Sequence, residues 1–214
     1  MGPTRSEPPA GTSGSRGPAR AYDMTRRSEG AESTRRRIAE AALELFKVRD
    51  FDAVSLNEIA RAAGVSHQTV LNHFESKAGL LPACAEVFSE QVAALELDVE
   101  RGDPVSVVHV TCLRYEQVGD ANARWADMEP RVPGLGPLLA QARQNFQRWL
   151  LDVLGDLMPP DDEPIEQQRV LLGLHAALEV HTWKLLRRDL GLSQEATEQQ
   201  LTDLVLGVLA RHRA

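Results

Sequence analysis

The chain has 214 residues, of which 43% are hydrophobic and 26% are charged, a composition typical of globular proteins. It contains no apolar run of about 20 residues, the length needed to cross a bilayer, and no apolar signal-peptide segment near the N-terminus. We therefore expect a cytoplasmic protein with no membrane partner, in which Cys84 and Cys112 are reduced core thiols rather than a disulfide or a metal pair.

The net charge of −7 is distributed unevenly. Residues 1–37 hold eight arginines against four acidic residues, whereas the remainder of the chain holds 16 basic and 27 acidic residues. A local basic segment is what phosphate binding needs, and the acidic remainder mainly favours solubility. The overall charge therefore does not exclude a nucleic-acid partner.

Residues 1–30 are rich in Pro, Gly, Ser, Thr, Ala and Arg and contain almost no large apolar side chain. Such a segment cannot bury enough surface to offset the entropy lost on ordering, so we expect a disordered basic arm. Two interpretations are open: an arm that follows DNA phosphates or a minor groove, and a solvated tail.

A helix is predicted over residues 34–48, because apolar side chains repeat there at helical spacing. Arg35 and Arg36 lie in its first turn, where the helix dipole disfavours cations. A nearby phosphate would resolve this conflict, and a solvated run of charge is the alternative. We expect Asp50 to follow the helix with a positive φ.

Residues 55–77 predict two short helices joined by a tight turn. Ser55 and Glu58 have the spacing of a capping box, in which the hydroxyl and the carboxylate each satisfy a free backbone N–H of the other residue. Gly64 follows the first helix where the chain must turn sharply, and glycine adopts positive φ without steric cost.

The second short helix is predicted over residues 67–74, with Ser66 as its N-cap. Val70 and Phe74 would pack inward. Uncharged hydrogen-bonding side chains then face outward, and such a row suits the reading of base edges in a major groove. The outward residues are His67, Gln68, Thr69 and Asn72.

This three-helix unit over residues 34–75 resembles the N-terminal domain of TetR-type transcriptional regulators. Asp50 stands where the family usually has Gly, and Leu71 stands where it usually has a Tyr that touches the DNA backbone. The position of Lys77 contacts that backbone in similar proteins. The residues that carry the resemblance are Ala41, Ala42, Leu45, Phe46, Ser55, Ile59, Ala60, Ala63, Gly64, Val65, Ser66, Thr69, His73, Phe74 and Lys77.

The candidate DNA-binding residues combine the outward face of the second helix with its caps and the nearby cations. They are Arg35, Arg36, Ser55, Ser66, His67, Gln68, Thr69, Asn72, His73 and Lys77. The expected organisation is a helix-turn-helix DNA-binding domain over residues 31–78 and a helical domain for ligand binding and dimerisation over residues 79–214.

The second domain is predicted to be helical throughout, which makes the fold class all-α. Ser76 would cap a helix that Pro82 kinks or interrupts and that ends near Glu100. Gly119 and Asp120 would break the next helical stretch. The helices expected further along span residues 104–118, 122–128, 138–158 and 164–189, with a last one from residue 193.

The last two helices are apolar on more than one face, and such helices need two packing partners. One partner is the core of the same chain, and a second subunit is the other. The resemblance implies a homodimer formed through these two helices, and a two-fold dimer would bind palindromic double-stranded operator DNA.

His175, Glu179 and His181 form a possible metal or acid–base group. His175 and Glu179 are four residues apart, whereas His181 would point elsewhere. The chain has no HExxH spacing, no Gly-rich phosphate loop and no nucleophile elbow. We therefore predict no catalytic residue, no metal and no cofactor, with core or interface histidines as the interpretation.

Aromatic and polarisable side chains are spread over the C-terminal helices at spacings typical of a core. Helical bundles often hold ligands between their helices, and regulators of the resembling family bind a small apolar or amphipathic effector there. The candidate effector-pocket residues are Phe88, His109, Cys112, Tyr115, Trp125, Phe146, Trp149 and His175.

The sequence thus predicts a dimeric, ligand-responsive and sequence-specific DNA-binding transcriptional regulator. Most such proteins are repressors that a small molecule releases from the operator. The alternative is a helical small-molecule-binding dimer that no longer reads DNA, which Leu71 and the acidic body of the chain favour.

Overall fold

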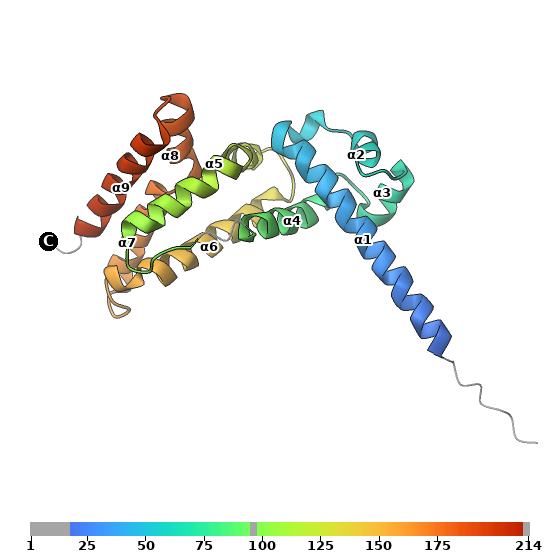
Figure 1. Cartoon of the computed structure of the whole chain (residues 1–214), viewed down its shortest axis with the longest axis horizontal. Helices are drawn as coiled ribbons and strands as arrows, with labels where there is room; N and C mark the ends of the chain where they lie inside the picture. Colours follow the sequence, from blue (N-terminus) through green and yellow to red (C-terminus); the bar gives the residue numbers. More distant parts are fainter. Residues whose placement is uncertain (1–17, 95–97, 212–214) are drawn as a thin grey trace, which may run out of the picture. The chain divides into compact units, whose positions relative to one another are not determined.

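The computed structural model describes residues 18–94 and 98–211, and every regular element in these ranges is helical (Figure 1). The chain divides into two compact units, one up to Arg35 and one from Arg36 onward. Helix α1 (Pro18–Val48) contributes residues to both units. No helix in the described ranges is long and apolar enough to cross a membrane.

Helix α1 begins sixteen residues before the predicted start at Thr34. The prediction of disorder was therefore wrong for residues 18–30, while residues 1–17 lie outside the described ranges. Pro18 stands at the first helical position, where proline is favoured, and residues 19–33 include three Ala and three Arg, which are good helix formers. The hydroxyl of Thr34 donates to the carbonyl of Gly30 at 2.8 Å within this helix.

The helix-turn-helix consists of α2 (Leu56–Ala62) and α3 (His67–Phe74), and α3 has the predicted bounds. A 3₁₀ turn over Phe51–Ala53 connects α1 to α2. Asp50 has φ −60° and ψ 144°, so the prediction of a positive φ there was wrong. The chain leaves α1 in an extended conformation, which every residue type adopts without strain.

A second correction concerns the start of α4 (Leu81–Ala93), which follows a 3₁₀ turn over Ala78–Leu80. Pro82 does not interrupt this helix, because it lies in the first turn, where its backbone nitrogen needs no acceptor. The helix ends at Ala93, before the predicted end near Glu100. Its buried residues pack with those of α1, α2 and α3.

Helix α5 (Pro104–Met128) is continuous, so the predicted break at Gly119 and Asp120 was wrong. Asp103 caps this helix by accepting from the backbone N–H groups of Val105 and Ser106. Gly119 is buried, and a Cβ added there would lie 2.5 Å from Cζ3 of Trp183. The glycine therefore permits a close approach between helices rather than ending one.

The remaining helices are α6 (Leu135–Leu154), α7 (Pro164–Ala177), α8 (Val180–Lys184) and α9 (Gln194–Arg211). The predicted helix over residues 164–189 is in fact α7, a break, α8 and a π-helical turn over Leu185–Asp189. Glu179 starts α8 by accepting from the backbone N–H of His181 at 2.6 Å, which accounts for the break.

Two clusters of buried side chains hold these elements together. The first core joins α1, α2, α3 and α4, and it includes Trp125 and Met128 from the end of α5 and Leu135 from the start of α6. The second core joins α5 to α6, α7, α8 and α9, with Trp183 fully buried in it. Helix α5 packs against α8 and α9, and α7 packs against both α6 and α9 (Figure 1). Helix α5 thus contributes to both cores.

Candidate functional site

The first helix of the helix-turn-helix begins with the predicted capping box. The hydroxyl of Ser55 accepts from the backbone N–H of Glu58 at 3.2 Å, and Glu58 Oε2 accepts from the backbone N–H of Ser55 at 2.8 Å. Arg49 extends the network by donating to Glu58 Oε1 at 2.8 Å. These bonds to Arg49 and Ser55 lower the pKa of Glu58 from 4.5 to about 2. The hydroxyl of Ser55 therefore stabilises the position of α2.

A pH-dependent contribution to stability follows from this cap. Because the folded-state pKa of Glu58 is depressed, its contribution is complete above pH 4.5 and is lost as the pH falls toward 2. The difference in unfolding midpoint between the wild type and Glu58→Gln should therefore shrink over that interval. Thermal unfolding followed by circular dichroism at pH 6, 4 and 2 measures it. Glu86→Gln, at an exposed site on α4, is the matched control for the loss of a carboxylate.

The tight turn before α3 is built by a glycine and a serine. Gly64 has φ +65°, the left-handed conformation that glycine adopts without strain. Ser66 then caps α3 by accepting from the backbone N–H of Thr69 at 3.0 Å, as predicted. The hydroxyl groups of Ser66 and Thr69 lie 2.8 Å apart and bond to each other. Both hydroxyls thus have partners within the turn.

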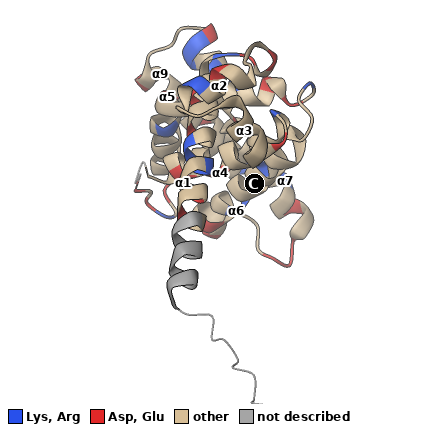
Figure 2. Ribbon diagram, turned by 90° about the vertical axis from the view of Figure 1, so that its right-hand side faces the viewer, with Lys and Arg blue, Asp and Glu red and all other residues tan. Residues whose placement is uncertain are grey.

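Helix α3 presents a polar, uncharged face. His67, Gln68 and Asn72 are exposed, and His73 and Thr69 are half-buried, while Val70 and Phe74 pack inward as predicted. The helix contains no Lys, Arg, Asp or Glu, and its ribbon is tan in Figure 2. Gln68 Nε2 donates to Asn72 Oδ1 at 2.9 Å, so two amide groups lie side by side on the exposed face. Side-chain amides of this kind can form two hydrogen bonds with an adenine edge.

The cations that were predicted to bind phosphate have partners within the protein. Lys77 Nζ donates to the carbonyl oxygens of Phe51 at 2.7 Å and Val54 at 2.9 Å, and it lies 4.4 Å from the centre of the Phe51 ring. Arg36 pairs with Glu40 at 2.9 Å and with Glu90 at 2.6 Å. Arg35 lies in the other unit of the chain. Phosphate contacts by these residues stay predictions, and Lys77 has a structural role that the sequence did not indicate.

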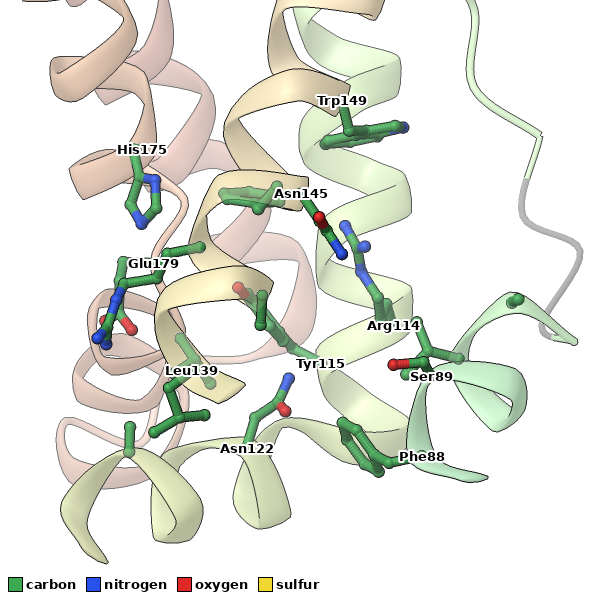
Figure 3. A pocket seen from close by; sticks show the side chains of 17 residues that line it. Phe88, Ser89, Arg114, Tyr115, Asn122, Leu139, Asn145, Trp149, His175 and Glu179 are labelled. Carbon is green, nitrogen blue, oxygen red and sulfur yellow. The ribbon is translucent and has the colours of Figure 1, made fainter. Parts of the chain in front are cut away.

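A cavity of about 430 Å³ lies between α4, α5, α6, α7 and the start of α8 (Figure 3). Five of the eight predicted pocket residues line it, namely Phe88, Tyr115, Phe146, Trp149 and His175. Its volume is within the range typical of small-molecule sites. The ring of Phe146 stacks on Trp149 at 5.6 Å and meets His175 edge-on at 5.4 Å. The described part of the chain thus contains an aromatic cavity suited to a small apolar body.

Three predicted pocket residues lie elsewhere. His109 is exposed and lies 3.1 Å from Glu198, and Cys112 is buried in the second core. Trp125 packs in the first core, where its ring stacks on Phe88 at 6.3 Å. Helical spacing alone does not distinguish a residue that faces a cavity from one that faces the adjoining core, and this is why these assignments were wrong.

Several polar side chains of the cavity were not predicted, namely Arg114, Asn122, Arg143 and Asn145, whereas Glu179 was considered only as part of a possible metal or acid–base group. One signal was present for Arg114, because it lies next to Tyr115 on the apolar stripe of α5. A charged residue at a core position is costly to bury and therefore marks a possible site. The remaining polar groups come from α5, α6 and the start of α8 and had no such signal.

The suspected group of His175, Glu179 and His181 is arranged differently from the prediction. His181 does not point elsewhere, because its Nδ1 lies 3.0 Å from Glu179 and its Nε2 lies 3.1 Å from Asp127. His175 instead faces the cavity, and burial lowers its pKa. Within residues 18–94 and 98–211, no group of three or more His, Cys, Asp or Glu side chains could hold a metal ion.

The capped turn, the buried inner face of α3 and its polar outer face together form a helix-turn-helix. Residues 38–84 match the sequence model of the bacterial regulatory proteins of the tetR family. Over its helix-turn-helix region the chain is therefore similar to TetR-type regulators.

Curated relatives named as regulators match part of the chain. The regulator AcrR of Shigella flexneri is 37% identical over 81 residues, which are 36% of this chain and 38% of that protein. The regulatory protein RaaS of Mycobacterium tuberculosis is 48% identical over 56 residues, 26% of each chain. The chain therefore aligns with well under half the length of these relatives.

Solved structures share the fold over most of the chain. A tetR-family regulator from Streptomyces coelicolor has a TM-score of 0.64 and 23% identity, covering 85% of this chain and 83% of its own. A regulator from Saccharomonospora viridis, solved in complex with choline, has a TM-score of 0.59 and 22% identity, covering 82% of this chain and 96% of its own.

Proposed function

We propose that this protein binds operator DNA through α3 and is released from it by a small molecule in the cavity. The observation that carries the proposal is the exposed row of uncharged hydrogen-bonding groups on α3, in a domain that matches the tetR family. A short helix with this face can enter a major groove and read base edges. Release by an effector would make the protein a repressor.

A homodimer is part of the proposal. Leu172 on α7 and Leu204 and Leu206 on α9 are exposed large apolar side chains, and α7 packs against α9. Exposed apolar side chains on two packed helices are consistent with an interface, and a second copy of the chain could cover them. Two-fold symmetry would then present two α3 helices to the two halves of a palindromic operator.

Helix α4 provides a route from the cavity to the DNA-binding domain. Phe88 and Ser89 of α4 line the cavity, while Leu81 and Cys84 near its start are buried in the first core with α3. Suppose that the effector binds more tightly to the protein when α4 is in one of two positions. Effector binding would then favour the placement of α3 that goes with that position of α4. By linkage, operator DNA would weaken effector binding by the same factor. The choline bound by the Saccharomonospora viridis regulator supports a ligand role for such a domain.

A DNA selection experiment tests the proposal. Genomic fragments retained by the purified protein are sequenced, and the affinity for a selected operator is measured at several salt concentrations. Gln68→Ala should weaken operator binding by about 10- to 100-fold and relax the base preference at one position. Binding should also fall steeply with salt, since phosphate contacts release counterions.

Gln117→Ala is the matched control, because Gln117 is an exposed glutamine on α5, outside the helix-turn-helix. It should leave operator affinity and base preference unchanged. A protein that retains no genomic fragment at low salt, or a Gln68→Ala variant with wild-type selection, would contradict the proposal.

The second candidate is a ligand-binding dimer that no longer reads DNA. The observation that favours it is the internal bonding of Lys77 and Arg36, which already pair with carbonyl or carboxylate oxygens. Leu71, half-buried on α3, offers no hydrogen bond to the DNA backbone. This candidate predicts that a ligand binds in the cavity and that the protein retains no DNA fragment at any salt concentration.

A further inference from the structure

Arg114 projects from α5 into the wall of the cavity (Figure 3). Its Nε is buried and has no hydrogen-bond partner in the described part of the chain. A terminal nitrogen of Arg114 makes one long hydrogen bond, of 3.5 Å, to the hydroxyl of Thr111. A guanidinium carries five N–H donors, and within the described part of the chain that of Arg114 makes only this one contact with an oxygen.

The other charged side chains of the cavity wall have partners. Arg143 forms a two-point bond with the carboxylate of Glu129, at 2.7 and 2.9 Å. Glu179 accepts from the backbone N–H of His181 and lies 3.0 Å from its ring. Among the described residues, Arg114 is therefore the charged group of the wall that lacks an ion-pair partner.

The aromatic faces of the cavity are already in contact with this cation. The Arg114 guanidinium lies 5.1 Å from the ring centre of Trp149 and 5.8 Å from that of Phe146. Figure 3 shows the guanidinium turned toward Trp149. A cationic ligand would have to share these faces with a like charge, which is unfavourable. The site therefore disfavours a quaternary ammonium and suits a negative group.

Burial makes the missing partner costly. Desolvation lowers the pKa of Arg114, which means that the surroundings disfavour its charged form. A buried charge is stabilised when a counter-charge forms hydrogen bonds with it, and a planar carboxylate fits a guanidinium at two points. Nearby, the buried Nδ1 of His175 also lacks a partner among the described residues, so the opposite wall offers a second polar contact.

We propose that the cavity takes a small anionic molecule with an apolar or aromatic body, and that Arg114 binds its carboxylate or an equivalent planar anion. The body would lie against Phe88, Tyr115 and Phe146. The hydroxyl of Tyr115 is already bonded to the carbonyl of Leu178 at 2.9 Å, so this ring contributes its apolar surface. The inference rests on the proposed function in taking the cavity as the effector site.

Two probes with the same ring system test the charge preference. Calorimetric titration of the full-length protein compares 1-naphthoate, which carries a carboxylate, with 1-naphthalenemethanol, which carries an uncharged alcohol. The wild type should bind 1-naphthoate about 10- to 100-fold more tightly, because a hydrogen-bonded ion pair replaces an uncompensated cation. Equal affinities, or no binding of either probe at millimolar concentration, would overturn the proposal.

Arg114→Met should bring the two affinities within about threefold, whereas Arg143→Met should keep the preference, since Arg143 already pairs with Glu129. Arg114→Lys retains the charge and should keep part of the preference. Arg114→Lys, together with near-ultraviolet circular dichroism of the buried tryptophans, distinguishes the loss of the contact with the ligand from unfolding of the protein. A preference that survives Arg114→Met, or that Arg143→Met removes equally, would contradict the role of Arg114.

The titrations use protein without DNA, so their outcome is independent of operator binding. A chain that retains no genomic fragment yet prefers 1-naphthoate through Arg114 would refute the regulator function and leave the inference standing. A chain that releases its operator on addition of an uncharged ligand, with no preference for 1-naphthoate, would support the regulator function and refute the inference.

Discussion

Replacing Lys77 by Met should lower the free energy of unfolding by about 2–3 kcal/mol. The substitution removes the ammonium group from the carbonyls of Phe51 and Val54 and from the face of the Phe51 ring. Two part-buried acceptors would lose their donor, while the methionine retains most of the packing volume. The midpoint of thermal unfolding should fall by about 4–10 °C for a chain of this length, at fixed protein concentration.

Arg37→Met is the control for this experiment, because Arg37 is an exposed cation on α1. An exposed substitution of this type should change stability by less than about 0.5 kcal/mol. If Lys77 acted only as a phosphate contact, Lys77→Met would weaken DNA binding without lowering the unfolding midpoint. Measuring both quantities on the same protein therefore separates a structural role from a DNA-binding role.

Gly119→Ala should destabilise the protein by about 1–2 kcal/mol, although alanine is the better helix former. In the interior of an exposed helix the change would stabilise by about 1 kcal/mol. Here the new Cβ would lie 2.5 Å from Cζ3 and 2.9 Å from Cη2 of the fully buried Trp183, so overpacking outweighs helix propensity. Chemical unfolding of the wild type and the variant measures the difference.

A double-mutant cycle with Trp183→Leu tests the cause. The smaller side chain vacates the space that the new methyl group needs, so Gly119→Ala should be neutral or stabilising in that background. A substitution that costs the same in both backgrounds would show that the loss does not arise from the contact between Gly119 and Trp183.

The helix-turn-helix could be predicted almost residue by residue because its determinants are local. The bonds of Ser55 with Glu58 and of Ser66 with Thr69 join residues three apart in the chain, and Gly64 supplies the turn between them. Such patterns depend little on the rest of the molecule. For the same reason the exposed face of α3 follows directly from its sequence.

The errors in the second domain concern residues whose roles depend on distant partners. Gly119 accommodates Trp183, which lies on another helix, so a glycine that looks like a helix breaker lies within a continuous α5. Conversely, the break after Ala177 contains neither Pro nor Gly and depends on the cap formed by Glu179. The residue type sets the helix propensity of a position, and packing against distant residues decides whether a helix forms there.

The cavity was predicted as an aromatic site, and its aromatic residues were mostly found. Its uncharged polar groups were not predicted, because Asn122 and Asn145 look like ordinary surface residues of a helix. Whether such residues face solvent or a cavity depends on how five helices pack, which no local pattern fixes. A charged side chain on the apolar stripe of a helix, such as Arg114, is the one feature of the sequence that could indicate a charged group in the cavity.

The two cysteines lie one in each of the two hydrophobic cores, so each can report when its own core opens. Cys84 is buried in the first core and Cys112 in the second, and burial raises the pKa of each thiol to about 12. Both are therefore protonated and unreactive while the cores are closed, because the thiolate is the species that attacks labelling reagents. The rate at which each sulfur is alkylated therefore measures how often its own core opens, and no additional cysteine has to be introduced.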